Sequence, residues 1–281
     1  MSAIAINERE FARFQRFILD IAGITMSDAK KALVSGRLAK RLHHFGLDSY
    51  DAYFELLADG QHPDEAQVAV DLLTTNETYF FREARHFDLL REAAAAHGSA
   101  GTTPFRVWSA ACSSGEEPYS IAMVLADVLG NAPWEVVASD ISTRVLQRAR
   151  IGHYPMERAT HVPPDYLKRF CLKGIREQQG TLLVDRALRQ RVQFRQVNLN
   201  TQLPDQLGMF DVIFLRNVMI YFNADTKRQV VARVTSRLKP GGHFFIGHSE
   251  SLQDISSAVQ PVIPSVYRKA AAVQPRDRQA A

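Results

Sequence analysis

The sequence has almost no cysteine, since Cys112 and Cys171 are the only two in 281 residues and neither has another cysteine nearby. We therefore expect neither a disulfide framework nor a cysteine-ligated metal site, and a reducing compartment is the default. Apolar runs of the roughly 18 residues needed to cross a membrane are also missing, as is a basic leader followed by an apolar segment. We expect a soluble, cytoplasmic protein without membrane insertion.

Several common catalytic and nucleotide-binding signatures are absent too. The chain has no G-x-G-x-x-G and no G-x-x-x-x-G-K-[ST] sequence, so dinucleotide and nucleoside-triphosphate binding lose their main support. Without G-x-S-x-G, Ser113 and Ser114 are poor candidates for a hydrolase nucleophile. None of the nine histidines forms a His-x-x-x-His or His-Glu-x-x-His pair, so no metal site is expected.

The composition is that of an ordinary globular protein, with 46% hydrophobic and 23% charged residues. The length allows one large domain or two unequal ones. A net charge of +4 and a pI of about 9.1 form a mild basic excess that identifies no partner on its own.

The most informative stretch of the chain is Val107–Ser120. A short buried strand leads into small residues ending at Gly115, where a ligand can approach the backbone closely. Glu116, Glu117 and Pro118 then open a helix that continues to residue 129. A strand, a small-residue loop and a helix form the ligand-binding end of an open α/β sheet. The two carboxylates argue against a bound phosphate and suit a ligand that carries hydroxyls and positive charge.

Asp140 follows the next predicted strand, 135–139, and lies 25 residues after Gly115. Nucleotide-binding sheets place an acid at this point to accept hydrogen bonds from ribose hydroxyls. The alternative role is a cap for the following helix, but a cap does not explain the loop upstream. Leu238–Gly242 adds a turn that ends a helix before an apolar strand. Together these features favour S-adenosylmethionine over NAD or ATP, with Glu116 or Glu117 complementing its amino group.

Residues 7–73 have a helical pattern and predict a small bundle, with helices near 11–21, 28–45, 49–58 and 64–73. Beside the apolar stripe of the second helix lie basic residues: Lys30, Arg37, Lys40, Arg41 and His44. Between Asp28 and Phe45 the chain has five Lys or Arg and one acid. This face is either an ordinary solvated surface or a docking surface for an acidic partner.

The second half alternates strands and helices, which predicts a parallel sheet. The alternation is interrupted after residue 151, and short strand patterns that include 182–184 and 192–194 predict an antiparallel β insertion at about 165–195. The predicted organisation is a helical domain at 1–75, a linker and connecting helix at 76–101, an α/β domain at 102–270 and a disordered tail at 271–281.

Four motifs, in this order, resemble those of the chemotaxis receptor methyltransferases: Asn76–Glu83, Ser109–Ser120, Arg216–Phe222 and Gly247–Leu252. The resemblance spans nearly the whole chain, including the helical domain and the insertion. It implies a class I, Rossmann-like S-adenosylmethionine methyltransferase sheet with an all-α N-terminal domain. Members of this family methylate glutamate side chains on the cytoplasmic helices of bacterial chemoreceptors. Leu215 departs from the family, where many members have Cys, and we attach no functional consequence to it.

The resemblance also implies S-adenosylmethionine as cofactor, S-adenosylhomocysteine as product, and a set of cofactor contacts: Asn76, Thr78, Arg82, Glu117, Asp140, Asn198, Leu199, Arg216 and Asn217. Of these, Asn76, Thr78 and Asn198 rest on the resemblance alone. Glu116 is left without a role. Arg82 and Tyr221 are predicted to position the acceptor carboxylate, although Tyr221 also fits the description of a core aromatic.

The implied partners are glutamate-rich receptor helices, attracted to Lys30, Arg37, Lys40 and Arg41. In some members the β insertion also binds a receptor's C-terminal peptide as an extra strand. We expect a monomer that binds no nucleic acid. Two alternatives remain: a non-catalytic cofactor-binding signalling module, and a nucleic-acid methyltransferase. The second predicts an Asn/Asp-Pro-Pro-Tyr pocket, which residues 216–219 do not resemble.

Overall fold

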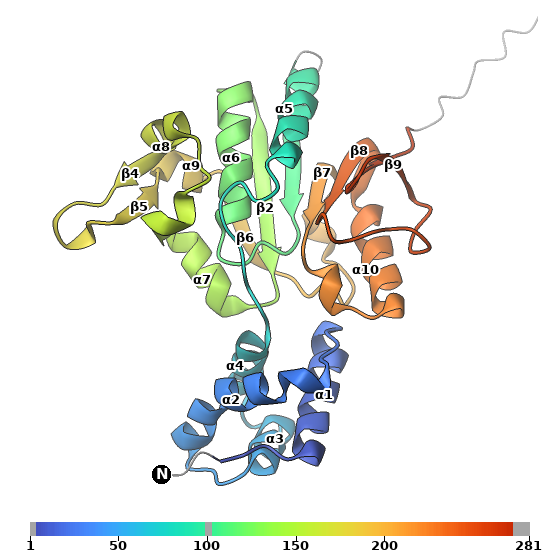
Figure 1. Ribbon diagram of the computed structural model, residues 1–281. Helices are drawn as coiled ribbons and strands as arrows, with labels where there is room; N and C mark the ends of the chain where they lie inside the picture. The colour runs from blue at the N-terminus through green and yellow to red at the C-terminus, as the bar shows by residue number, and fades with distance from the viewer. Residues whose placement is uncertain (1–3, 99–102, 272–281) are drawn as a thin grey trace, which may run out of the picture.

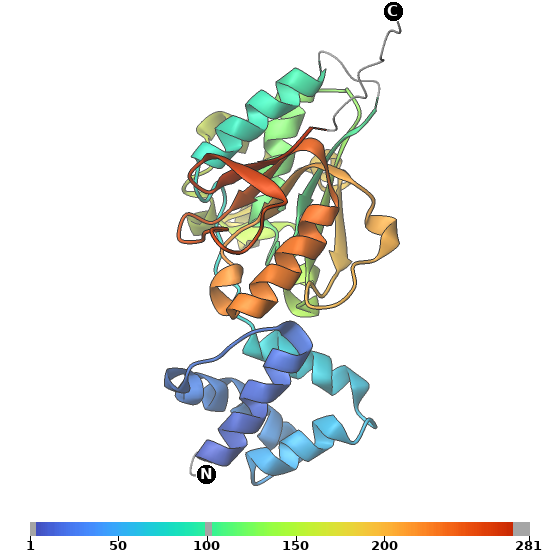
Figure 2. The same cartoon turned by 90° about the vertical axis from the view of Figure 1, so that its right-hand side faces the viewer.

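The computed structural model describes residues 4–98 and 103–271, so the predicted tail from 272 onward and residues 99–102 lie outside it. The chain begins with a small helical domain, seen below the sheet in Figures 1 and 2: α1 (Glu8–Ala22), η1 (Asp28–Lys30), α2 (Lys31–Phe45), α3 (Tyr50–Ala58) and α4 (Pro63–Leu73). This order confirms the predicted bundle.

Local sequence sets the ends of α1. The Asn7 side chain accepts from the Glu10 backbone N–H, and the Glu10 carboxylate accepts from the Asn7 N–H, which together form a capping box. Gly23 ends the helix in the left-handed region, with φ 71°. Phe14, Tyr50 and Tyr53 are fully buried in the core of this domain. The helices therefore pack through large aromatic side chains.

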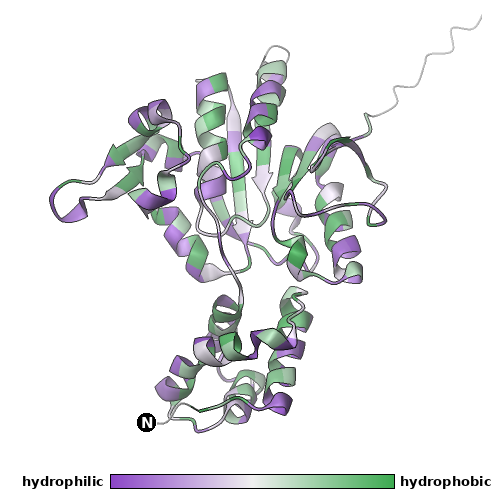
Figure 3. Ribbon diagram, viewed as in Figure 1, coloured by the Kyte–Doolittle hydropathy of each residue, from purple (hydrophilic) through white to green (hydrophobic). Residues whose placement is uncertain are grey.

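The second domain is built on a seven-stranded sheet in the order β6-β2-β1-β7-β8-β10-β9. Its strands are β1 (Phe105–Ser109), β2 (Trp134–Asp140), β6 (Val192–Gln196), β7 (Phe210–Leu215), β8 (Leu238–Ile246), β9 (Val259–Ile263) and β10 (Val266–Lys269). The accompanying helices are α5 (Arg85–Gly98), α6 (Glu116–Leu129), α7 (Thr143–Ile151) and α10 (Ala224–Ser236). Hydrophobic residues run along β7 and through α6 in Figure 3, because the sheet is buried on both faces by clusters of apolar side chains.

The first five strands of this order run parallel, and β10 pairs antiparallel with both β8 and β9. The chain goes from β1 to β2 on one side and later returns to place β7 on the other side of β1. The strand order therefore reverses beside β1. Open α/β sheets bind ligands at the carboxyl ends of the strands at such a point.

The antiparallel insertion is a separate three-stranded sheet in the order β3-β5-β4. It contains β3 (His153–Pro155), η2 (Met156–Ala159), α8 (Pro164–Phe170), β4 (Cys171–Lys173), η3 (Arg176–Gln178), β5 (Thr181–Val184) and α9 (Arg186–Arg189).

Placing residues 192–194 in this insertion was wrong, because β6 pairs in parallel with β2 in the main sheet. The insertion also begins earlier than 165, at β3. Short apolar strands look alike in sequence, whichever sheet they join.

Two further strands differ from expectation. β8 begins at Leu238 rather than at residue 243, so the Pro-Gly-Gly segment lies within the strand, where the pairing with β7 shifts register. β9 was not predicted, since its sequence Val-Gln-Pro-Val-Ile contains a proline; as an edge strand it tolerates one. Within the described residues, no helix is both long and apolar enough to cross a bilayer.

The helical domain contacts the carboxyl-end edge of the main sheet. The Thr25 N–H donates to the Tyr221 carbonyl at 2.8 Å, and Ile24 forms an antiparallel bridge with Phe222. On the other side, the Asp71 carboxylate accepts from the Thr143 N–H and hydroxyl at the start of α7. The helical domain is thus fixed over the ends of the strands.

Candidate active site

A cavity of about 560 Å³ lies between the carboxyl ends of the strands and the helical domain. This volume is within the usual range for a small-molecule site. Every residue predicted to contact the cofactor lines it: Asn76, Thr78, Arg82, Glu117, Asp140, Asn198, Leu199, Arg216 and Asn217. Tyr221 and Lys30 line it as well. Residues far apart in sequence are therefore brought to one place.

The loop between β1 and α6 approaches the cavity in a conformation that requires small residues. Ser113 and Gly115 have φ values of 48° and 100°. A side chain at Gly115 would lie 2.7 Å from the Tyr154 hydroxyl and 2.8 Å from the Ala149 Cβ, so only glycine fits there. Cys112 is buried in the same loop, and burial raises the pKa of its thiol well above the usual value. Cys112 is therefore an inert thiol rather than a nucleophile.

Asp140 lies at the end of β2, on the cavity wall. Its two carboxylate oxygens accept from the Ser113 N–H at 2.9 Å and the Ser142 N–H at 3.0 Å. Burial raises the pKa of Asp140, and the backbone hydrogen bonds oppose that rise. Two ionised oxygens offer about four acceptor positions, so the carboxylate has capacity left for ligand hydroxyls.

The adjacent acids Glu116 and Glu117 face different surroundings. Glu117 lines the cavity and accepts from the Ser109 hydroxyl and the Arg216 Nε, both at 2.7 Å. Glu116 is fully buried and does not line the cavity; it accepts from the Ser114 hydroxyl and from Arg158 Nη1, again at 2.7 Å. The structure thus gives Glu116 a structural partner, which sequence reasoning had not found.

Arg216 is a buried cation on the cavity wall, 6% exposed. Besides the Nε bond to Glu117, its Nη1 donates to the Arg82 carbonyl at 2.6 Å, to His86 Nδ1 at 3.0 Å and to Glu83 at 3.3 Å. Within the described part of the chain, Nη2 has no hydrogen-bond acceptor. One side of the guanidinium is therefore held by the protein, and the other remains for a ligand.

Glu83, His86 and His248 come together behind Arg216, with potential ligand atoms within 4.8 Å of one another. The Glu83 carboxylate accepts from the His248 N–H at 3.1 Å and from the Asn217 side chain at 3.3 Å. Burial raises the pKa of Glu83, but these hydrogen bonds and the charge of Arg216 outweigh burial and lower it overall. Because the Arg216 guanidinium donates into this cluster, we interpret it as a hydrogen-bonded support rather than a metal site.

Glu250 is a second support that sequence reasoning missed. Its carboxylate accepts from the backbone N–H groups of Gly247, Asn217 and Met219 at 2.6, 2.9 and 2.8 Å. These bonds hold the loop after β7, in which Asn217 has φ 57°. Glu250 lies within the motif Gly247–Leu252, but nothing in that motif showed which loop its carboxylate would hold.

The strip from Asn76 to Arg82 passes along the cavity between the two domains. The Asn76 carbonyl accepts from the Ser113 hydroxyl, and the Thr78 carbonyl accepts from Arg158. Arg82 Nη1 donates to the Glu77 carbonyl at 3.1 Å, and its guanidinium lies 5.7 Å from the Tyr79 ring. The strip is therefore held mainly through its backbone.

Asn198, Leu199 and Tyr221 complete the wall on the side of the helical domain. The Asn198 side chain donates to the Ile21 carbonyl at 2.7 Å and accepts from the Asn200 N–H, so this amide joins the two domains. Tyr221 is partly exposed, and its hydroxyl has no hydrogen-bond partner among the described residues. Tyr221 is thus available to a ligand rather than confined to the core.

The four basic residues predicted to dock a partner differ in their contacts within the protein. Arg37 donates to the carbonyls of Leu73 and Thr74 at the end of α4, and Arg41 binds the buried Glu65 through two hydrogen bonds. Both guanidinium groups therefore stabilise the helical domain itself. Lys30 and Lys40 are exposed, and neither is paired with an acid in the described part of the chain.

Comparison with known proteins identifies the family. Residues 76–267 match the CheR methyltransferase SAM-binding domain, and residues 9–74 match the CheR methyltransferase all-α domain. The chain belongs to the CheR methyltransferase family. Its cofactor is S-adenosylmethionine, and the class I methyltransferase sheet predicted from the sequence is confirmed.

Individual CheR relatives match over almost their whole length. The chemotaxis protein methyltransferase of Escherichia coli is 43% identical over 254 residues, covering 90% of this chain and 87% of that protein. Chemotaxis protein methyltransferase 2 of Pseudomonas aeruginosa is 43% identical over 263 residues, covering 93% of both chains. A chemotaxis protein methyltransferase of Borreliella burgdorferi is 34% identical and covers 95% of this chain and 96% of its own.

The CheR cavity suits this cofactor by its own donors and acceptors. Asp140 offers a carboxylate for hydroxyls, Glu117 offers negative charge, and Arg216 offers a free Nη2 donor for a carboxylate. S-adenosylmethionine carries ribose hydroxyls, an amino group and a carboxylate. The residues present therefore fit the group that the family implies.

Proposed function

We propose that this CheR protein transfers the methyl group of S-adenosylmethionine to glutamate side chains on the cytoplasmic helices of chemoreceptors, forming methyl esters. The names of the relatives support chemotaxis as the setting. The observation that carries the choice of acceptor is that no histidine lines the cavity among the residues the structure describes, while the carboxylates of Glu117 and Asp140 there already accept hydrogen bonds from the protein. A glutamate acceptor, with a pKa of about 4.3, is already ionised near pH 7 and needs no general base.

We assign the cofactor contacts by charge and hydrogen-bonding capacity. Asp140 accepts from the ribose hydroxyls, Glu117 complements the amino group, and Arg216 Nη2 donates to the carboxylate. Asn76, Thr78, Asn198, Leu199 and Asn217 form the remaining walls. The cofactor supplies a methyl group on a positively charged sulfur, and the protein's task is to hold the acceptor in line with it. Such placement alone can supply about 7–11 kcal/mol of the barrier.

Arg82 and Tyr221 are the proposed positioning residues for the acceptor carboxylate. Both line the cavity, Arg82 as a partly exposed cation and Tyr221 with an unengaged hydroxyl. Arg82→Ala and Tyr221→Phe are expected to lower kcat at saturating cofactor. If both variants keep wild-type turnover, this assignment is wrong.

The acceptor class has a direct chemical test. The protein is incubated with receptor and S-adenosylmethionine labelled in the methyl group, and the receptor is then treated with base. Glutamyl methyl esters release labelled methanol, whereas methylated amides or nucleobases do not. Cofactor binding without transfer would identify a signalling module instead, and label in nucleic acid would identify a nucleic-acid methyltransferase.

For partner recognition we propose that Lys30 and Lys40 attract the acidic receptor helices. Lys30 lines the cavity itself, which supports a role in attracting an acidic acceptor to it. We also propose that the β insertion binds a receptor C-terminal peptide beside β4, which is an edge strand with exposed Leu172 and Ile175 nearby. Titration with receptor C-terminal peptides tests this tether, and no binding would exclude it. We further propose that the enzyme acts as a cytoplasmic monomer.

A further inference from the structure

His86 is a buried histidine to which the proposed reaction gives no role. It lies in the first turn of α5, 1% exposed, with its ring centroid 5.2 Å from that of Phe245 and 5.1 Å from that of His248. Burial and the neighbouring charge of Arg216 lower the pKa of His86 to about 3. The ring is therefore neutral at pH 7 and carries one proton.

The partners of the two ring nitrogens fix the position of that proton. Arg216 Nη1 lies 3.0 Å from Nδ1, and because a guanidinium only donates, Nδ1 is the acceptor. The Glu83 carboxylate oxygen also faces Nδ1, but it is farther away, at 3.4 Å, and itself accepts from Arg216 Nη1. The proton is therefore on Nε2, which lies 2.8 Å from the Ser265 hydroxyl oxygen. Ser265 donates its own proton to the Pro264 carbonyl at 2.6 Å, so its oxygen is free to accept. The hydrogen bonds from Arg216 to His86, from His86 to Ser265 and from Ser265 to Pro264 therefore all run in one direction.

This row of hydrogen bonds, from Ser265 through His86 to Arg216, reaches the cavity at Arg216. Its Nη1 is shared among His86, the Arg82 carbonyl and Glu83, while Nε is bound to Glu117. These bonds fix the plane of the guanidinium and leave Nη2 as the group without a protein acceptor among the described residues. A protonated His86 would place a second positive charge beside Arg216 and remove an acceptor from it.

We propose that His86 is a positioning residue for Arg216: as a neutral ring protonated on Nε2, it offers Nδ1 to the guanidinium and thereby directs Nη2 toward the cofactor carboxylate. The effect on cofactor binding rests on the contact proposed above for Arg216. The position of the ring proton does not depend on that contact, so the two ideas are tested separately.

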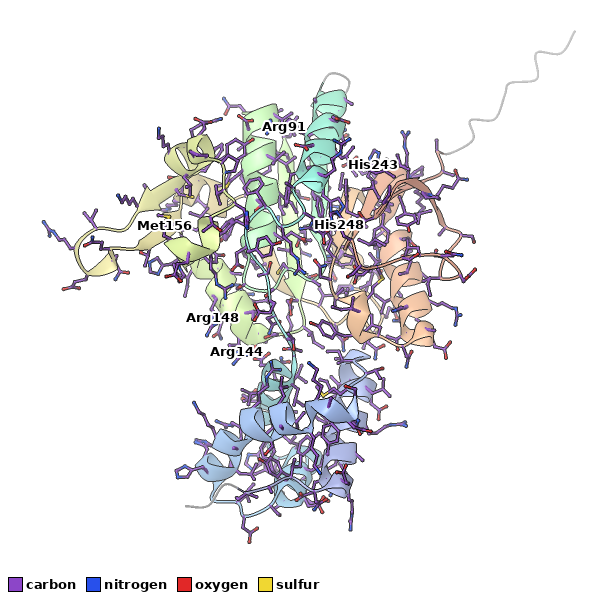
Figure 4. All side chains as sticks on the ribbon, in the orientation of Figure 1. Arg91, Arg144, Arg148, Met156, His243 and His248 are labelled. Atoms are coloured by element: carbon purple, nitrogen blue, oxygen red, sulfur yellow. The ribbon has the colours of Figure 1, made fainter. Side chains whose placement is uncertain are left out.

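Two substitutions separate the two nitrogens of the ring. In His86→Asn the amide oxygen can take the place of Nδ1 and still accept from Arg216. In His86→Gln the amide nitrogen can take the place of Nε2, so only the hydrogen bond to Ser265 is kept. His243→Gln is the matched control, since His243 is a partly buried histidine on β8 whose pKa is also lowered by burial, and it does not line the cavity. Figure 4 labels His243 and His248 at separate positions in the part of the molecule that contains β8.

The readouts are the Kd for S-adenosylhomocysteine, from calorimetry, and the free energy of unfolding in urea. We expect His86→Gln to bind about tenfold more weakly than wild type, as for loss of one hydrogen bond to a charged group. His86→Asn should bind within about threefold of wild type, yet be the less stable of the two because it removes more of the buried ring. His243→Gln should bind as wild type does. Affinity and stability thus rank the two His86 variants in opposite orders, which a merely structural role does not predict.

Equal affinity losses in the two His86 variants, or losses that follow stability, would overturn the proposal. A second measurement needs no variant: the ¹⁵N spectrum of the wild-type ring should show Nδ1 without a proton, and a proton on Nδ1 would also overturn it. Arg216→Gln tests the underlying contact. If that change leaves cofactor affinity intact, the assignment of Arg216 fails whatever the state of His86.

Discussion

The adjacent acids Glu116 and Glu117 provide a test in which one chemical change is made at two neighbouring positions. Glu116 is fully buried and paired with Arg158 at 2.7 Å, whereas Glu117 lines the cavity. Breaking a buried ion pair costs about 3–5 kcal/mol. The Arg158 side chain is 41% exposed and regains hydration, so we expect Glu116→Gln to lower the free energy of unfolding by about 2 kcal/mol. For a protein of this size that corresponds to a fall in Tm of about 5 °C.

Cofactor binding should show the reverse pattern. Glu116→Gln is expected to keep the Kd for S-adenosylmethionine within about twofold, because Glu116 is not on the cavity wall. Glu117→Gln should weaken binding at least about tenfold, since it removes a charge that complements the ligand and orients Arg216. Urea unfolding and calorimetry of both variants give the comparison. The reasoning is refuted if Glu116→Gln weakens binding as much as Glu117→Gln does while leaving stability unchanged.

Three further predictions concern the domain interface, pH and docking. Gly23→Ala should lower the free energy of unfolding by about 2 kcal/mol in urea, because φ is 71° and the new Cβ would lie 2.6 Å from the Thr226 methyl carbon; a neutral effect would contradict this packing. Because the pKa of native His86 is about 3, the unfolded chain alone takes up a proton as the pH falls below about 6.5, so stability falls. Between pH 8 and pH 5 the free energy of unfolding of the wild type should therefore fall by about 2 kcal/mol more than that of His86→Asn. Parallel curves of unfolding free energy against pH for the two proteins would refute the low pKa. Lys40→Glu should lower receptor methylation several-fold at low salt with cofactor affinity intact, whereas Arg9→Glu, an exposed control on α1, should not; equal losses would argue against docking at Lys40.

Local chemistry accounts for what the sequence predicted well. The strand, small-residue loop and helix around Gly115, and the acid at the end of β2, are each set by residues within a few positions of one another. The supporting network could not be predicted in this way. Glu83 meets Asn217 across 134 residues, and His86 meets Ser265 across 179, so no local pattern contains the information.

Dependence on distant contacts also explains why residues 192–194 were wrongly assigned to the insertion. β6 is about as short as the strands of the insertion and carries only two apolar residues, Val192 and Phe194, so its partner strand decides which sheet it joins. Arg37 and Arg41 looked like a free basic face because α2 has no acidic residue of its own. Their partners lie on or just after α4, a helix that sequence periodicity places only approximately relative to α2.

The wall of the cavity is shared between the two domains. Ile24 and Leu73 belong to the helical domain, and Asp140 and Arg216 belong to the sheet, yet all four line the same space. Cutting the chain near residue 75 would therefore divide the wall of this cavity, whatever the folding of each half. Exchange of helical domains between relatives would therefore alter the lining of the cavity as well as the outer surface.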